Sequence, residues 1–232
     1  METHAQLPVA LPEPEDGAPA TSQSGARRGV ASIEVPCRAL DIVVSFFTLV
    51  VLSPLMAIIA LAIKLDSRGP VLFNQRRVGL DLETFVVHKF RTMHHGADHG
   101  VHREYYLELI ANAVPGRKLE RDTRVTRVGR FLRRTSLDEL PQLWNVLRGQ
   151  MSLVGPRPPI PYEVEKYPPH WFARFGVKPG ITGLWQVSGR STVSIEEMIH
   201  LDIEYARTRS LATNLWIILR TIPAVLSLRG AS

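Results

Sequence analysis

Residues 135–158 read TSLDELPQLWNVLRGQMSLVGPRP and bring two kinds of charged group together. Two adjacent carboxylates, Asp138 and Glu139, open a short expected helix, and a Gly-Pro-Arg-Pro turn follows with Arg157 inside it. Five more arginines precede the acids: Arg124, Arg127, Arg130, Arg133 and Arg134. The planar guanidinium suits the clamping of phosphoryl groups, and carboxylates commonly hold Mg²⁺ against a substrate phosphate. An acidic pair within a field of arginines therefore points to chemistry on an anionic phosphate.

The same acids also have a purely structural interpretation. Ser136 followed by Glu139 fits the capping-box pattern, Gly149 suits a helix end, and acids are favoured at a helix N-terminus whatever their chemistry. Pro141 fits uneasily in that helix, so the helix is expected to start a few residues later. In the functional interpretation Asp138 is a nucleophile or base, and Glu139 is a metal ligand or a second acid/base group. The pattern alone leaves both interpretations open.

A long apolar segment precedes this stretch. Residues 40–65 read LDIVVSFFTLVVLSPLMAIIALAIKL and carry no charge between Asp41 and Lys64. At about 1.5 Å per helical residue, this run can cross a hydrocarbon layer of about 30 Å. A buried helix of a soluble core is rarely so long and so uniformly apolar. The segment therefore predicts contact with membrane lipid.

Whether this segment crosses the membrane is a separate question. Ser53-Pro54 lies at its centre, where proline removes a helical hydrogen bond and predicts a kink. Basic residues flank both ends: Arg27, Arg28 and Arg38 before it, and Lys64, Arg68, Arg76 and Arg77 after it. A crossing helix normally keeps its basic excess on the cytoplasmic side alone, so the flanks fit a re-entrant helix. Proline is also tolerated in spanning helices, and both topologies stay open.

The whole chain is basic and holds a single cysteine. Its 232 residues carry a net charge of +6 with a pI near 9.8, which favours anionic partners such as nucleic acid, acidic lipid or a phosphorylated substrate. Because Cys37 is alone, an intrachain disulfide is excluded. The chain before the apolar segment is rich in Pro, Ala, Gly, Ser and Glu without apolar periodicity, which predicts a disordered tail.

Two short strands are expected after the apolar segment. VLF at 71–73 and TFVVHKF at 84–90 flank Gly79 and Asp81, a pattern typical of a β-hairpin. Lys89 and Arg91 add cationic groups at the end of the second strand.

A histidine-rich loop follows the hairpin. HHGADHGVH at 94–102 holds Asp98 and four histidines: His94, His95, His99 and His102. Such spacing can ligate a transition metal. Glycines break any helix that would align the imidazoles, so a solvated loop is expected instead.

Three later segments are expected to be helices, and two of them are expected to lie on a surface. Residues 126–134, TRVGRFLRR, combine an apolar face with arginines, which suits a membrane interface. Residues 195–207 predict an amphipathic helix. Residues 211–228 are apolar, but Arg220 and Pro223 interrupt them, which predicts a surface-lying helix and no second span.

A glycine-rich segment at 178–190, KPGITGLWQVSGR, separates these helices. Its non-helical character suits a close approach to a nucleotide, with Gln186 and Arg190 as candidate contacts. A pair of tight β-turns is the structural alternative.

Taken together, these residues resemble the bacterial sugar transferase family, the monotopic polyprenyl-phosphate phosphoglycosyl transferases. The likeness runs from about residue 38 to the C-terminus. It rests on the apolar helix with central Ser53-Pro54, on QRRVG at 75–79, KFRTM at 89–93, RVTRVGRFLRRTSLDELPQLWNVLRGQMSLVGPRP at 124–158 and KPGITGLWQVSGR at 178–190. The likeness is greatest to the short exopolysaccharide members that transfer galactose-1-phosphate, and it includes TIPAVLSLRG near the C-terminus.

The resemblance implies a role for each matching residue. Asp138 would attack the β-phosphate of a UDP-sugar, expel UMP and hold the sugar phosphate as an aspartyl ester until undecaprenyl phosphate accepts it. Glu139, together with Asp138, would hold Mg²⁺. The candidate substrate-binding residues are Lys89, Arg91, Arg133, Arg157, Gln186 and Arg190. Galactose is the expected sugar, with glucose and N-acetylhexosamines as alternatives. A membrane-tethered basic adaptor is a further alternative, which leaves the acid pair unexplained.

The resemblance also implies an architecture and a location. The expected fold is α+β: a mostly helical, membrane-associated domain with a small β-hairpin and an N-terminal re-entrant membrane helix. The chain would divide into a disordered tail at 1–35, a re-entrant membrane helix at 36–66 broken at Ser53-Pro54, and a catalytic domain with interfacial helices at 67–232. This domain would lie on the cytoplasmic face of the bacterial inner membrane and start exopolysaccharide or other surface-glycan assembly. The arginines would then contact phosphate and lipid headgroups, with no role in nucleic-acid binding.

Two positions depart from the family's pattern. Leu82 stands where the hairpin turn often has a second glycine, so the turn geometry is expected to differ. Thr123 stands where a proline is usual, with a consequence confined to a loop.

Overall fold

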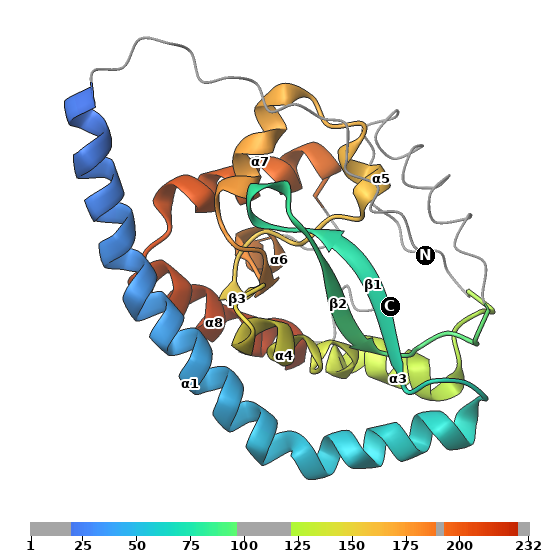
Figure 1. Cartoon of the computed structure of the whole chain (residues 1–232). Coiled ribbons are helices and arrows are strands. Elements are labelled where there is room, and N and C mark those ends of the chain that lie inside the picture. Colours follow the sequence, from blue (N-terminus) through green and yellow to red (C-terminus); the bar gives the residue numbers. More distant parts are fainter. Residues whose placement is uncertain (1–19, 97–121, 189–192, 227–232) are drawn as a thin grey trace, which may run out of the picture.

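The computed structural model describes residues 20–96, 122–188 and 193–226 of the chain (Figure 1). Several expectations fall outside these residues. They are the first part of the tail (1–19), residues 98, 99 and 102 of the histidine loop, and Arg190.

The apolar segment forms most of one long helix, α1 (Ala20–Asp66). Pro54 lies inside α1, and the Ser53 hydroxyl donates to the Val50 carbonyl oxygen at 2.8 Å. Both features bend helices, and Figure 1 shows α1 bent midway around the domain. The helix begins within the segment 1–35 that was expected to be disordered, which corrects that boundary. Extending a formed helix is far easier than nucleating one, so the apolar helix carries weakly helical residues before it.

Charged side chains attach the first half of α1 to the domain. Arg38 donates to two carbonyl oxygens at the end of α4 (Gln142–Leu147), at 2.6 and 2.8 Å. Asp41 is buried, and its Oδ1 atom accepts from the Ser152 hydroxyl at 3.0 Å and from the Leu153 backbone N–H at 2.8 Å. The second half is attached by apolar packing, through a cluster that includes Ile59, Ile63, Phe90 and Leu132. Both halves of α1 therefore lie against the same domain.

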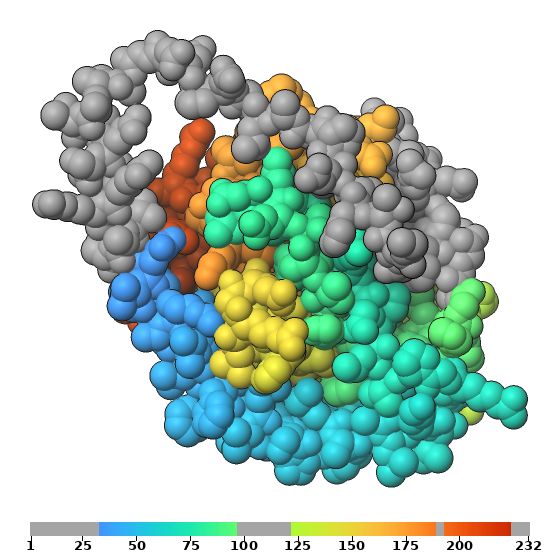
Figure 2. Space-filling model, viewed as in Figure 1, coloured from blue at the N-terminus to red at the C-terminus, as the bar shows by residue number. Residues whose placement is uncertain are grey.

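The outer face of α1 is apolar from Ile42 to Leu65. Exposed apolar side chains recur every three or four residues on both sides of Pro54: Ile42, Val43, Phe46, Phe47, Val50, Val51, Leu55, Ile58, Leu61 and Leu65. We call this set the α1 stripe. Within the described residues, α1 is the one helix long and apolar enough to cross a membrane. In the space-filling view, α1 forms the edge of the molecule (Figure 2).

The predicted β-hairpin is confirmed. Strands β1 (Leu72–Val78) and β2 (Thr84–Phe90) pair in antiparallel register, with Lys89 opposite Phe73. A short 3-10 turn, η1 (Leu80–Leu82), joins them, and Leu82 adopts a positive φ of 64°. The position where a glycine is often found thus keeps a left-handed backbone, at a steric cost of about 1–2 kcal/mol. Leu82 packs against an apolar cluster around Trp171, which offsets part of that cost.

A second, parallel pair of strands was not predicted. Strands β3 (Ser152–Val154) and β4 (Gly180–Thr182) are only three residues long, too short for a periodic signal in the sequence. A Cβ atom on Gly180 would lie 2.0 Å from the backbone nitrogen of Gly155. Glycine is therefore required here so that the two backbones can approach.

Helices surround these strands, and the expected mixture of helices and small sheets is confirmed. The remaining elements are α3 (Arg127–Thr135), η2 (Leu137–Glu139), α5 (Pro161–Val164), η3 (Pro169–Gly176), α6 (Leu184–Ser188), α7 (Ile195–Thr208) and α8 (Leu211–Leu226). One core cluster joins α4, β3 and α8 through residues such as Val146, Val154 and Ile217. A second cluster packs η3 against α7 through Trp171, Phe175 and Ile199. Between the two clusters, β3 leads into the turn that carries Arg157.

Candidate active site

The acid pair lies in a single 3-10 turn between two helices. Ser136 has a positive φ of 57° and ends α3, and η2 then carries Asp138 and Glu139 into α4. The later helix start expected from Pro141 is confirmed, because α4 begins at the next residue. The capping box expected at Ser136 is wrong, since that residue makes no side-chain cap. An N-cap residue normally has extended φ and ψ angles, whereas Ser136 is left-handed, and the Glu139 carboxylate accepts from Lys89 instead.

Glu139 faces the β-hairpin. The Lys89 ammonium, on β2, donates to Glu139 Oε1 at 2.7 Å, and the two side chains are 27% and 31% exposed. Asn145 holds α4 against the same strand, because its side chain donates to the Val86 carbonyl oxygen at 2.7 Å and accepts from the His88 N–H at 3.2 Å. The hairpin therefore supplies the Lys89 cation to the acid pair, and the packing of α4 on β2 keeps Lys89 close to Glu139.

The two neighbouring carboxyls have different protonation behaviour. Burial, reinforced by the negative charge of Glu139, raises the pKa of Asp138 to about 6, against the lowering effect of Lys89 and Arg133. Burial also acts to raise the pKa of Glu139, but the charge and hydrogen bond of Lys89, helped by Arg157, outweigh it and lower that pKa. Glu139 is thus held ionised, and Asp138 ionises close to neutral pH.

Arg133 approaches the acids from α3. Its Nε atom donates to the Thr92 hydroxyl at 2.9 Å, just beyond β2. Burial lowers the pKa of Arg133, and the nearby charge of Asp138 opposes that shift. Gly129 allows α3 to lie this close, because a Cβ atom there would be 2.0 Å from the Thr92 carbonyl oxygen. Sequence reasoning did not single out this glycine.

Arg157 lies on the turn that follows β3. Its guanidinium is 3.9 Å from the Glu163 carboxylate, which is buried on α5 and accepts from the Ile160 N–H at 3.1 Å. Arg77, buried at the end of β1, donates to the Pro158 carbonyl oxygen at 2.9 Å. Burial and the neighbouring Arg157 lower the pKa of Arg77 to about 10, and Glu163 opposes this shift.

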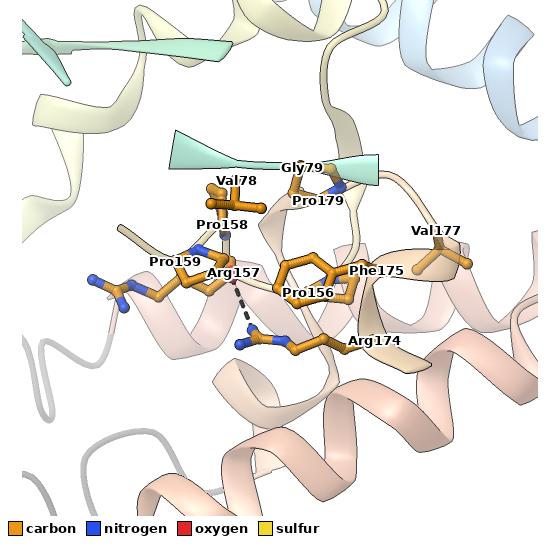
Figure 3. Close-up of a pocket in the computed structure, with 10 residues that line it drawn as sticks. All are labelled: Val78, Gly79, Pro156, Arg157, Pro158, Pro159, Arg174, Phe175, Val177 and Pro179. Atoms are coloured by element: carbon orange, nitrogen blue, oxygen red, sulfur yellow. Dashed lines mark hydrogen bonds between the residues drawn. The ribbon is translucent and has the colours of Figure 1, made fainter. Parts of the chain in front are cut away.

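Figure 3 shows the other side of this turn. A shallow pocket is lined by the prolines of the turn, by Val78 and by Phe175. The Arg157 side chain points away from the pocket, and Arg174 lies beneath the turn (Figure 3). The pocket is therefore the supporting side of the turn, and the guanidinium of Arg157 is presented on the opposite side.

The structure brings Asp138, Glu139, Lys89, Arg133 and Arg157 into one region, and it places two other candidates elsewhere. Arg91 is buried and donates to the carbonyl oxygens of Arg68 and, at 2.8 Å, of Ser67, where it completes the end of α1. Gln186, on α6, donates to the Ile181 carbonyl oxygen at 3.2 Å.

Sequence reasoning missed three residues around the Arg157 turn: Arg77, Glu163 and Arg174. Arg77 was visible in the QRRVG segment, where alternate residues of a strand share a face and the second arginine follows Gln75 by two. Glu163 and Arg174 carry no comparable signal in the sequence, since their burial is decided by tertiary packing.

The acid pair fits a divalent cation by its donor chemistry. Two adjacent carboxylates supply hard oxygen ligands, and the raised pKa of Asp138 marks a place where additional positive charge would favour ionisation. Among residues 20–96, 122–188 and 193–226, no group of three or more His, Cys, Asp or Glu side chains is arranged to hold a metal ion. Two carboxylates leave coordination positions that substrate phosphates commonly fill when Mg²⁺ is bound.

Comparisons with known proteins agree with these features. The sequence model of the protein family described as bacterial sugar transferase matches residues 34–228. The exopolysaccharide production protein ExoY of Sinorhizobium fredii is 40% identical over 90% of this chain and 92% of its own length. The UDP-glucose:undecaprenyl-phosphate glucose-1-phosphate transferase of Caulobacter vibrioides is 44% identical over 86% and 73%. The undecaprenyl-phosphate galactose phosphotransferase of Salmonella typhimurium is 41% identical over 84% of this chain but only 41% of its own length.

Proposed function

Because this chain belongs to the bacterial sugar transferase family, we propose that it transfers a hexose-1-phosphate from a UDP-sugar to undecaprenyl phosphate and releases UMP. The observation that supports this most is the acid pair under the charges of Lys89 on β2, Arg133 on α3 and Arg157 on the turn after β3. One carboxylate, Asp138, is partly buried and ionises near neutral pH. The three cations near the acid pair suit the phosphates of a nucleotide sugar.

The reaction proceeds in two displacements at phosphorus. Ionised Asp138 attacks the β-phosphorus of the donor, the bond to the bridging oxygen breaks, and UMP leaves with that oxygen and its electron pair. An oxygen of undecaprenyl phosphate then attacks the aspartyl-bound phosphorus and frees the Asp138 carboxylate. Arg157 and Arg133 bind the anionic oxygens, and Lys89 keeps Glu139 ionised. Mg²⁺ held by Asp138 and Glu139 would neutralise charge on the phosphates when it is bound.

The sugar is proposed to be galactose, with glucose as the second candidate. Likeness to two relatives that are named for galactose, each 41% identical, supports galactose. The Caulobacter relative, which is named for glucose, is 44% identical and supports the second candidate. Hexoses that differ at a single hydroxyl are best separated by assay.

The α1 stripe is proposed to enter one leaflet of the bacterial cytoplasmic membrane and to return to the same face. Both halves of α1 pack on one domain, and the stripe continues through the bend at Pro54. The outer face of α8 adds Leu215, Trp216, Leu219 and Ile222, which are exposed. Arg220 stacks on Trp216 at 5.3 Å, an arrangement suited to the headgroup level. The catalytic domain would then lie on the cytoplasmic face, where an undecaprenyl phosphate headgroup is within reach.

The activity is tested by UMP release. Purified protein is incubated with undecaprenyl phosphate, Mg²⁺ and, separately, UDP-galactose, UDP-glucose and UDP-N-acetylhexosamines. UMP release with a hexose is expected, and its absence with every UDP-hexose would refute the proposal. Asp138→Asn should lose at least about a thousandfold in rate and the covalent sugar-phosphate mass, because an amide is not a nucleophile here. The matched control is Asp81→Asn, an exposed acid on the hairpin turn.

The topology is tested by labelling a cysteine placed near the N-terminus after Cys37 is replaced by serine. In the otherwise unchanged chain, a membrane-impermeant reagent outside the cell should leave the cysteine unlabelled. Replacing Ser53 and Pro54 by leucine should straighten the helix and expose the cysteine to the reagent. Labelling in the unchanged chain would refute re-entry.

A further inference from the structure

We propose that the buried Arg174–Asp202 pair positions Arg157 for phosphate binding by holding the backbone carbonyl of Arg157 itself. The inference rests on the proposed function, in which the Arg157 guanidinium binds phosphate oxygens of the donor. It assigns to two buried residues, far apart in sequence, an effect on donor affinity.

The contacts form one connected unit. Arg174, on η3, donates through Nη2 to Asp202 Oδ2 on α7 at 2.5 Å and to the Arg157 carbonyl oxygen at 2.9 Å. Its Nη1 atom donates to the Tyr167 hydroxyl at 2.9 Å. Both charged side chains are 1% exposed, and the guanidinium lies 5.7 Å from the Phe175 ring centre. The planar fork thus reaches three acceptors at once, which a lysine ammonium on the same backbone could not do.

Of the carbonyls at 156, 157 and 159 in this turn, Arg174 holds that of Arg157. The neighbouring carbonyls of the turn accept from other elements: that of Pro156 from the Gly180 N–H, and that of Pro159 from the Val78 N–H, both at 2.9 Å. The Arg157 carbonyl accepts from Arg174, on the pocket side of the turn, and the Arg157 side chain extends from the opposite side (Figure 3). Rotation of this peptide would therefore swing the guanidinium.

The chemistry of the pair also argues for a role beyond packing. Burying two charges is expensive, and apolar side chains of similar volume often stabilise a core equally well. Burial raises the pKa of Asp202 to about 6, against the opposing charges of Arg174 and then Arg157. Because the same Arg174 nitrogen donates to Asp202 and to the Arg157 carbonyl oxygen, the pair lies directly against Arg157, the proposed phosphate-binding residue.

The test replaces the whole pair by apolar residues, Arg174→Met with Asp202→Leu, so that no buried charge is left alone. We expect thermal unfolding within a few degrees of the wild type, and a KM for the UDP-sugar raised about tenfold with kcat changed less, as for the loss of one charge-supported contact. Arg174→Lys keeps a cation beside Asp202 and loses the fork. It should raise KM in the same direction, and it decides the question if the apolar variant does not fold.

A double-mutant cycle separates positioning from general damage. In an Arg157→Lys background, which lacks the planar fork, the apolar pair should raise KM by less than about twofold further, because its effect acts through Arg157. Wild-type KM in the folded apolar variant or in Arg174→Lys, or full additivity with Arg157→Lys, would overturn the inference. Failure of the proposed function appears separately, as an absence of UMP release by the wild-type protein.

Discussion

Replacing Asp41 by alanine is expected to lower the unfolding free energy by about 2–4 kcal/mol. One carboxylate oxygen, Oδ1, accepts from both the Ser152 hydroxyl and the Leu153 N–H. Asp41, Ser152 and Leu153 are all buried, at 4%, 8% and 8% exposure. Alanine would leave both donors unsatisfied at about 1–3 kcal/mol each, and the removal of a buried charge offsets part of that sum. For a chain of this size the loss corresponds to a fall in Tm of roughly 5–12 °C.

Asparagine at the same position separates hydrogen bonding from charge. Its amide oxygen can take the place of Oδ1 and accept both bonds, so Asp41→Asn should stay within about 1 kcal/mol of the wild type. Glu34→Ala is the matched control on the same helix. Glu34 pairs with Arg209 at 2.9 Å and is 59% exposed, and exposed pairs contribute about 1 kcal/mol or less.

The assay is thermal unfolding of detergent-solubilised protein, monitored by circular dichroism. A Tm for Asp41→Ala within 2 °C (about 1 kcal/mol) of that for Glu34→Ala would refute the argument. Equal losses for Asp41→Ala and Asp41→Asn would show instead that charge, and not hydrogen bonding, attaches α1 to β3. Because β3 leads directly to Arg157, the outcome also bears on how the membrane helix supports the site.

Three further results are expected at the site. Lys89→Met should lower kcat/KM about fivefold to tenfold, because Glu139 loses the cation 2.7 Å away; Lys89→Arg should keep most activity, and equal losses would contradict an ionic role. With the pKa of Asp138 raised to about 6, kcat/KM should fall about tenfold per pH unit below that value as the nucleophile is protonated. Added Mg²⁺ should move this limb to lower pH, and a profile flat from about pH 5 to 7 at limiting Mg²⁺ would exclude Asp138 as the titrating group. Gly129→Ala should displace α3 from Thr92 and cost about 2 kcal/mol or more; an unchanged Tm would contradict the close approach.

Local sequence patterns were sufficient to predict the apolar helix, the hairpin and the start of α4. The uncharged run around Ser53-Pro54 predicted a kinked apolar helix, and two short strand-like runs on either side of Gly79 and Asp81 predicted the hairpin; both are confirmed. Pro141 correctly indicated a later start for α4. The three-residue strands β3 and β4 were missed, because their pairing depends on segments 25 or more residues apart and not on any local period.

In the candidate site, too, the sequence indicated some residues, and tertiary packing decided their partners. Asp138, Glu139 and Arg157 stand out in 135–158 because their residue types and spacing suit phosphate chemistry. The partner of Glu139 does not follow from that spacing: Lys89 reaches it only because β2 packs on α4 and η2, 50 residues away in sequence. Arg91 is only two residues from Lys89, but its side chain contacts the end of α1 and not the acid pair. The sequence did not distinguish these two cations.

The sequence by itself determined the family, the apolar helix and the acid pair, because each depends on residue types at short, fixed spacing. Tertiary structure alone decided which carboxyl is held ionised, since burial raises the pKa of Asp138, whereas the charge and hydrogen bond of Lys89 outweigh burial at Glu139 and lower its pKa. It also decided that both halves of α1 lie on one domain, because Asp41 and Ile63 contact residues that folding brings to them from 27 or more positions away. Electrostatic interactions and packing depend on distances in space, and these distances cannot be read from the order of residues.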